Sequence, residues 1–295
     1  MFFGSVQPLQ SFIRAPTSCS RRFLGSSSRR LQENAKVASS SREAATREDP
    51  LPLLNRPLGV VEYPTVVAKS RAERLQDMLD HDKVIAERRH IIKEATKGYF
   101  DDLNDTRRHG GKTWIAPKSL IREDKSLYLP NITGRTLDSS KKQHTTSMCQ
   151  GRITILAMLG TKISEIHTKG FIDPAYERYK SNPFFQFIQI NLQENLLKSM
   201  LVNLFTRSLR NSIPPELHSK YLVSNQNMEY VRDPMSMTNS KVGYVYLIDE
   251  NVKIRWGGCA DAMIEETRAL ETCTGVLLNR LEKRGAALPS PPPVE

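Results

Sequence analysis

The stretch KVGYVYLIDENVKIRWGGC (residues 241–259) decides the fold that the sequence predicts. Residues 242–248 are β-branched and aromatic on both faces, which is typical of a central strand covered on both sides. The polar residues 249–251 predict a tight turn, in which the asparagine can adopt the left-handed conformation. Residues 252–256 then alternate, with the lysine and the arginine facing solvent, and two glycines end the strand. We therefore expect a hairpin of one central strand and one strand with a solvent-exposed face.

Residues 1–33 have the composition of a mitochondrial targeting segment. The first 32 residues contain five arginines, seven serines and no acidic residue. The alternative is a disordered basic tail, whereas a secretory signal is excluded because no apolar core of the required length follows the charges. Without these five charges the formal net charge falls from +11 to +6 (11 − 5), so the rest of the chain is only mildly basic.

Three further segments flank the predicted globular domain. Four prolines interrupt residues 34–65, so we expect a linker there. Residues 66–112 are predicted to be a charged helical segment, because apolar side chains recur at helical spacing between 69 and 97 on a nearly balanced charged background. The proline-rich residues 285–295 are expected to form a disordered tail.

Residues 113–284 are predicted to form one α/β domain, which begins with short extended segments and turns up to about residue 137. The elements that follow are an apolar parallel strand at 152–159, a helix capped by Ser164, a strand at 185–192, a helix at 195–211, the hairpin, and a last helix at 260–284. Strand, helix, strand, helix, hairpin, helix is the order of a thioredoxin-like core with a mixed sheet.

The same order locates the place where a redox protein of this class carries its reactive thiols. Residues 152–164 correspond to the first core strand and the active-site turn, and Gly243 stands where the cis-proline normally lies. The two redox cysteines would then fall near Ile163 and Ile166. Isoleucine has no thiolate, so disulfide exchange cannot take place at these positions.

Other chemistry has little support in the sequence. The cysteines beyond the targeting segment have no CxxC spacing and the histidines no short ligand spacing, so we expect no metal, no cofactor and no catalytic residue. No Lys/Arg cluster is interleaved with aromatic residues, so nucleic acid is not an expected partner. No catalytic motif is visible, so we expect no small-molecule substrate. No apolar run approaches the about 20 residues that span a bilayer.

Four longer stretches carry a family resemblance. They are WIAPKSLIREDKSLYLPNITGRTL (114–137), QINLQENLLKSMLVNLF (189–205), RNSIPPELHSKYLVS (210–224) and MTNSKVGYVYLIDENVKIRWGGCA (237–260). Together they resemble the mitochondrial ATPase-complex subunit 10 family over residues 57–281. The resemblance implies a non-catalytic assembly factor, a chaperone that helps to incorporate subunit a into the membrane sector of mitochondrial ATP synthase. It also implies a peripheral position on the matrix side of the inner membrane.

Two places in the sequence are candidate contacts for such a client. Met200 and Leu204 lie in a broad apolar stripe of the helix at 195–211, although a stripe at helical spacing normally faces its own sheet. Arg255 and Trp256, at the end of the hairpin, form the second candidate. The alternative for this pair is a tryptophan in the core and an arginine in solvent.

Two other functions remain open at this stage. A thioredoxin-like thiol reductase or peroxidase could use the single cysteine Cys259, because a helix N-terminus directly after it would lower the pKa of its thiol. A stable structural subunit of ATP synthase is the second alternative. It predicts stoichiometric co-purification with the complete complex, whereas an assembly factor accompanies only intermediates.

Overall fold

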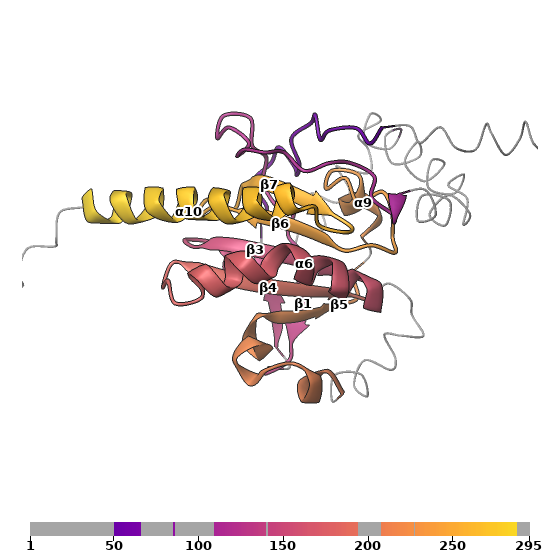
Figure 1. Ribbon diagram of the computed structural model, residues 1–295. Helices are drawn as coiled ribbons and strands as arrows, with labels where there is room; N and C mark the ends of the chain where they lie inside the picture. The colour runs from indigo at the N-terminus through magenta and orange to yellow at the C-terminus, as the bar shows by residue number, and fades with distance from the viewer. Residues whose placement is uncertain are drawn as a thin grey trace, which may run out of the picture. The chain divides into compact units, whose positions relative to one another are not determined.

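Figure 1 presents a computed structural model of the chain, which describes residues 50–65, 85, 109–139, 141–193, 208–226 and 228–287. The strands are β1 (Thr133–Thr136), β2 (Lys142–His144), β3 (Ile153–Leu159), β4 (Phe185–Leu192), β5 (Tyr221–Ser224), β6 (Tyr244–Ile248) and β7 (Ile254–Cys259). The helices are α5 (Thr145–Cys149), α6 (Lys162–Tyr179), the 3-10 helix η1 (Pro215–Lys220), α9 (Glu229–Arg232) and α10 (Ile264–Ala287). The strands form one mixed sheet in the order β2-β1-β5-β4-β3-β6-β7.

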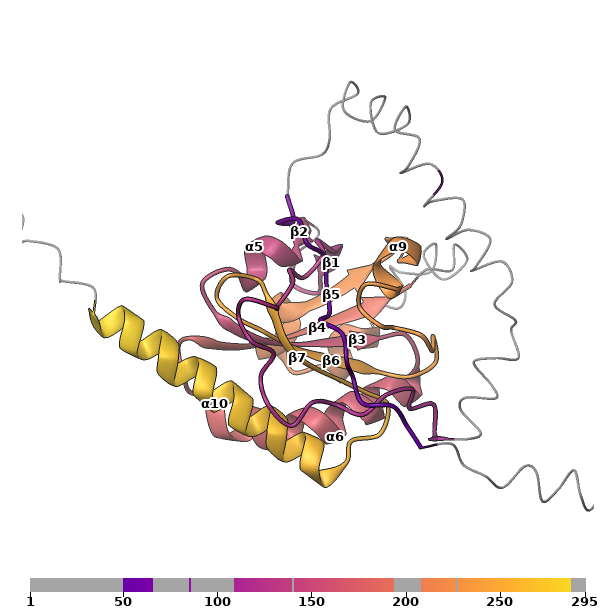
Figure 2. The same cartoon turned by 90° about the horizontal axis from the view of Figure 1, so that it is seen from above.

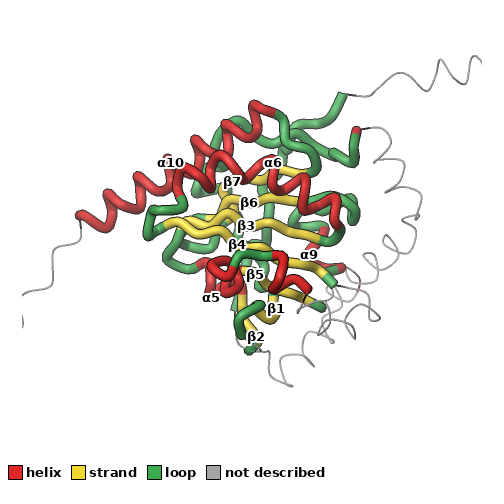
Figure 3. Tube along the Cα trace, turned by 60° about the horizontal axis from the view of Figure 1, so that its bottom comes forward, coloured by secondary structure: helices red, strands yellow, loops and turns green. Residues whose placement is uncertain are grey.

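Strand β3 is the centre of the sheet, and all seven of its residues are buried. It pairs parallel with β4 and antiparallel with β6. Because α6 makes the crossover between the two parallel strands, the order β3-α6-β4, hairpin, α10 gives the predicted thioredoxin-like core. Helices α6 and α10 lie side by side on one face of this sheet (Figures 2 and 3). The strands predicted at 152–159 and 185–192 are confirmed.

Helix α6 begins one turn earlier than the sequence suggested. Thr161, and not Ser164, is its N-cap residue: the Thr161 hydroxyl accepts a hydrogen bond from the Ser164 backbone N–H at 3.1 Å. The Ser164 hydroxyl accepts the Thr161 N–H in return, at 3.0 Å. Ser164 is thus the N3 residue of a capping box whose N-cap is Thr161, and the prediction of Ser164 as the N-cap was wrong.

The β6–β7 hairpin is present, but its turn differs from the prediction. The left-handed residue is Val252, with φ of 64°, rather than Asn251. The Asp249 carboxylate fixes this turn, because its Oδ1 accepts the backbone N–H groups of Asn251 at 3.0 Å and Lys253 at 2.9 Å. The Val252 side chain is fully buried, and this burial offsets the strain of a β-branched residue in that conformation.

Strand β7 continues through Gly257 and Gly258, which were expected to end it. A Cβ on Gly257 would lie 2.6 Å from Leu58 Cδ1, and a Cβ on Gly258 would lie 2.9 Å from Phe171 Cε1. Neighbouring residues of a strand face opposite sides of a sheet. The two glycines therefore let an aliphatic residue pack closely on one face of β7 and an aromatic residue on the other.

Two segments that precede the sheet pack along β7, and the compact unit of the chain starts at Pro50. Leu58 is fully buried, and the Val60 N–H donates to the Tyr128 carbonyl at 2.9 Å. Farther along, the Ile254 N–H donates to the Leu127 carbonyl at 2.8 Å. The predicted linker at 34–65 is therefore wrong for residues 50–65, which belong to the domain and help to cover the edge of the sheet.

Several predictions lie outside the described residues. These are the targeting segment at 1–33, most of the charged helical segment at 66–112, and the helix at 195–211 up to residue 207. The last helix reaches Ala287, so the first three residues of the predicted tail are helical and the remainder is not described.

Candidate functional site

The positions predicted for redox thiols are occupied by exposed apolar side chains on the first two turns of α6. Ile163 is 54% exposed and Ile166 is 65% exposed. One turn after Ile166, a Cβ on Gly170 would lie 3.7 Å from Ala262 Cβ, so the residues before α10 lie beside this face of α6. Met263 and Ile264 follow there, 43% and 72% exposed. We call these four exposed side chains the α6–α10 apolar surface.

A buried ion pair fixes the start of α10 beneath this surface. The Lys112 ammonium lies 2.7 Å from Glu266 Oε2 and also donates to the carbonyls of Cys259 and Asp261 at 3.0 and 2.8 Å. The same carboxylate accepts the backbone N–H groups of Ala116 at 2.8 Å and Met263 at 3.0 Å. Because both charges are fully hydrogen-bonded, the pair holds the segment at 109–116 firmly against the N-terminus of α10.

His167 lies beside this pair, on the inner side of α6. It is 7% exposed, and its Nε2 is 3.5 Å from Asp261 Oδ1. Burial lowers the pKa of His167; the Asp261 carboxylate acts in the opposite direction and the Lys112 ammonium adds to the lowering. The imidazole is therefore neutral at pH 7. Within the described ranges, no group of three or more His, Cys, Asp or Glu side chains is arranged to hold a metal ion.

The cysteines are core residues. Cys149 and Cys259 have no exposed surface and Cys273 is 5% exposed. Burial raises the pKa of the Cys149 thiol to about 12 and that of Cys273 to about 11. Burial also raises the pKa of Cys259, whose Sγ donates to the Trp114 carbonyl at 3.4 Å. The expected lowering of the Cys259 pKa was wrong, because this residue ends β7 and the helix begins five residues later.

Arg255 and Trp256, one of the two candidate client contacts, are also buried, at 4% and 0% exposure. Arg255 Nη1 lies 3.1 Å from Asp249 Oδ2, and Trp256 Nε1 donates to the Pro117 carbonyl at 2.7 Å. The segment from 117 to 129 covers both side chains, so neither offers a contact surface and the arginine does not face solvent. Met200 and Leu204, the other candidates, lie outside the described residues.

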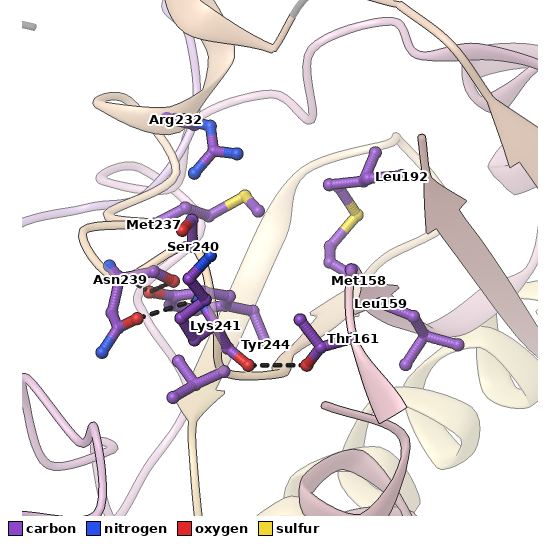
Figure 4. A pocket seen from close by; sticks show the side chains of 12 residues that line it. Met158, Leu159, Thr161, Leu192, Arg232, Met237, Asn239, Ser240, Lys241 and Tyr244 are labelled. Atoms are coloured by element: carbon purple, nitrogen blue, oxygen red, sulfur yellow. Dashed lines mark hydrogen bonds between the residues drawn. The ribbon is translucent and has the colours of Figure 1, made fainter. Parts of the chain in front are cut away.

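A cavity of about 250 Å³ opens at the carboxyl ends of β3 and β4, next to the first turn of α6 (Figure 4). Met158, Leu192 and Met237 line its apolar floor. Arg232 and Lys241 lie on its rim, and the Thr161 hydroxyl donates to the Lys241 carbonyl at 2.7 Å, which ties the rim to α6. None of the described residues that line the cavity is acidic. No sequence pattern indicates this site, because Arg232 and Lys241 come from a connection without a motif.

Comparison with known proteins places the chain in a family. A family model described as "ATP10 protein" matches residues 35–277. The chain belongs to the ATP10 family. "Mitochondrial ATPase complex subunit ATP10" of Saccharomyces cerevisiae is 30% identical over 244 residues, which are 77% of this chain and 87% of that protein. The protein of the same name in Candida glabrata is 26% identical over 274 residues, 91% and 96% of the two chains.

Solved structures similar to this ATP10 family member include thiol–disulfide proteins. A secreted thiol-disulfide isomerase from Corynebacterium glutamicum is 11% identical, with a TM-score of 0.41 over 56% of this chain and 92% of that chain. A DsbF homologue from Corynebacterium diphtheriae is 13% identical, with a TM-score of 0.37 over 55% and 93% of the two chains. Among the described helices of the ATP10 family member, none has the length and apolar character to cross a membrane.

Proposed function

We propose that this chain is a non-catalytic assembly factor of mitochondrial ATP synthase, which holds subunit a until this subunit enters the membrane sector. The printed names of the relatives connect them with the mitochondrial ATPase complex, and the family model extends over most of this chain. We further propose a peripheral position on the matrix side of the inner membrane, where such a client would be met.

The observation that carries the non-catalytic part of this proposal is the pair of exposed isoleucines on α6. The order of elements predicts the cysteines of a thiol–disulfide protein near Ile163 and Ile166, which are both exposed, and the described cysteines are buried with raised thiol pKa values. An exposed apolar surface on a folded domain is typical of a site that binds another polypeptide or a membrane. The α6–α10 apolar surface could cover an apolar part of subunit a before its final helix neighbours arrive.

Site-specific crosslinking tests this function. A photoreactive amino acid at Ile166 should crosslink to newly made subunit a while mitochondrially encoded proteins are being synthesised. The matched control is the same amino acid at Phe184, which is also apolar and 38% exposed but lies before β4, at the opposite end of the parallel strands. Crosslinks confined to this chain, or equal crosslinking from both positions, would contradict the client-binding surface.

A second measurement separates an assembly factor from a structural subunit. The chain should co-purify with intermediates that contain subunit a and should be absent from the complete ATP synthase. Stoichiometric recovery with the complete enzyme would instead make it a structural subunit. A variant in which Cys149, Cys259 and Cys273 are replaced by serine or alanine should still support assembly if it folds.

A further inference from the structure

Another pocket, of about 330 Å³, lies near the start of β3, at the opposite end of this strand from the first turn of α6. Its described lining residues are Tyr63, Tyr128, Gln150, Glu250, Asn251 and Lys253, and we call it the tyrosine pocket. The hairpin turn is fixed at this place, because the Gly151 N–H donates to the Glu250 carbonyl at 2.9 Å. The tyrosine pocket is therefore distinct from the α6–α10 apolar surface.

Two tyrosine rings form a corner in this pocket. The ring centroids of Tyr63 and Tyr128 are 5.3 Å apart and the ring planes meet at 77°, so the edge of one ring meets the face of the other. Tyr63 is 47% exposed. Backbone hydrogen bonds in both directions between Val60 and Tyr128, each 2.9 Å long, join the two segments that carry the rings. The corner is thus preformed and presents aromatic surface to solvent.

Polar groups stand beside the aromatic rings. Gln150 and Asn251 are exposed and supply side-chain amides, and the Lys253 ammonium lies 5.5 Å from the centroid of the Tyr128 ring. A polyproline II helix makes no internal hydrogen bonds, so its carbonyl groups take donors from a partner. Aromatic rings that receive prolines, with hydrogen-bond donors beside them, are the usual way in which proteins bind proline-rich segments.

The chain itself carries such a segment. Residues 288–293, LPSPPP, follow directly after α10. In the last turns of α10, Arg284 Nη1 lies 2.5 Å from Glu250 Oε1, and Glu250 lines the tyrosine pocket. Ala287 ends the helix three residues later, about 4.5 Å farther along its axis. Six residues of polyproline II span about 19 Å, so the segment starts close to the pocket and is long enough to enter it.

We propose that the tyrosine pocket is a docking site for a proline-rich segment in the polyproline II conformation, and that residues 288–293 of the same chain occupy it. A proline ring packs into the corner of Tyr63 and Tyr128, and the amides of Gln150 and Asn251 donate to carbonyl groups of the segment. The covalent connection through α10 supplies a high effective concentration, and the stiff segment loses little conformational entropy. The inference does not depend on the proposed function.

Fluorine NMR on the full chain tests this proposal, with 3-fluorotyrosine at all nine tyrosines. Tyr63→Phe and Tyr128→Phe each remove one signal, which assigns the two rings of the pocket. The triple variant Pro291→Ala, Pro292→Ala, Pro293→Ala should shift both signals and leave the other seven in place, which also shows that it is folded. Ser290→Ala retains every proline and is the matched control, in which no signal should move.

A synthetic peptide, acetyl-Leu-Pro-Ser-Pro-Pro-Pro-amide, is the probe for binding in trans. Added to the triple variant, it should return the signals of Tyr63 and Tyr128 to their wild-type positions in a saturable way. Its apparent affinity for the wild-type chain should be at least about tenfold weaker, because the chain's own segment competes. In the triple variant, Tyr63→Ala should weaken peptide binding at least about tenfold, whereas Phe184→Ala, at an exposed aromatic residue outside the pocket, should not.

Several results would overturn the proposal. Unchanged signals of Tyr63 and Tyr128 in the triple variant, or equal peptide affinity for that variant and the wild type, would show that residues 288–293 do not occupy the pocket. Signals that depend on the chain concentration would mean that a second copy supplies the segment. Equal effects of Tyr63→Ala and Phe184→Ala would place the peptide elsewhere. None of these results bears on the crosslink from Ile166, so the proposed function stands or fails separately.

Discussion

Arg255 is a single residue for which the alternating sequence pattern predicted exposure to solvent and the structure shows burial. It alternates correctly with its apolar neighbours, but it is 4% exposed and paired with Asp249, which is 1% exposed. Its Nε also donates to the Ile121 carbonyl at 2.9 Å. Removing one member of the pair leaves the other charge buried without its partner, which destabilises the fold. The two residues must therefore be kept or changed together.

Arg255→Ala should therefore lower the free energy of unfolding by about 3–5 kcal/mol, because the Asp249 carboxylate stays buried without its partner. Urea denaturation measures this change. The control is Lys118→Ala, which removes a cation from an exposed pair with Glu265 and should change stability little. A small effect of Arg255→Ala would mean that the pair is accessible to water.

His167 predicts a pH dependence at the same scale. Because burial lowers its pKa in the folded state, the unfolded chain binds more protons as the pH falls below the ordinary histidine pKa of about 6.5. The contribution of His167 to stability should thus be full above that pH and should decrease as the pH falls toward 5. Asp261 and Lys112 face this imidazole: the carboxylate of Asp261 limits the lowering of the pKa, and the ammonium of Lys112 adds to it.

Urea denaturation between pH 5 and 7 compares the wild-type chain with His167→Gln. The free energy of unfolding of the wild type should fall more steeply on acidification than that of the variant. His144→Gln, which replaces a half-buried histidine on β2, is the control and should retain the steep slope. Equal slopes in the wild type and His167→Gln would show that this imidazole accepts protons as easily when folded as when unfolded.

The element that tests close packing most directly is β7. Gly258→Ala places a methyl group 2.9 Å from carbons of both Phe171 and Trp256, and we expect a loss of about 1–3 kcal/mol in the free energy of unfolding. The matched control is Gly160→Ala, whose new Cβ would lie 3.5 Å from the Ser240 carbonyl, an ordinary contact distance. Thermal and urea unfolding should separate the two variants. Similar stability of both would imply that Phe171 and Trp256 can move apart.

Elements whose residues are buried on both faces could be predicted from the sequence almost to the residue. Strand β3 is apolar except for Thr154, and β4 carries five apolar residues among its eight, and such buried strands have one stable place in an α/β domain. The details of turns and helix caps could not be predicted, because they depend on which groups become hydrogen-bond partners in the folded chain. Val252 is left-handed where the asparagine before it was expected, since the Asp249 carboxylate and side-chain burial decide the turn.

At the scale of the whole molecule, the order of elements predicted which residues take the positions of redox thiols, but it predicted no contact surface there, and the packing of distant segments was not predictable. Ile163 and Ile166 followed from strand and helix order alone, and they are exposed at the start of α6. Trp256 could not be placed, because the segment that covers it lies more than a hundred residues earlier in the chain. The cavity likewise joins residues from three separate parts of the chain, 158–161, 192 and 232–244.

This long-range packing makes residues 50–65 part of the folded unit, and Leu58 is the position that tests it. Its side chain has no exposed surface and fills the space left by Gly257, so Leu58→Ala should cost about 2–5 kcal/mol of unfolding free energy. Leu53→Ala removes the same atoms from a side chain that is 63% exposed and should cost far less. If the two substitutions had equal effects in urea denaturation, residues 50–65 would be a linker after all, and the domain would begin near residue 109.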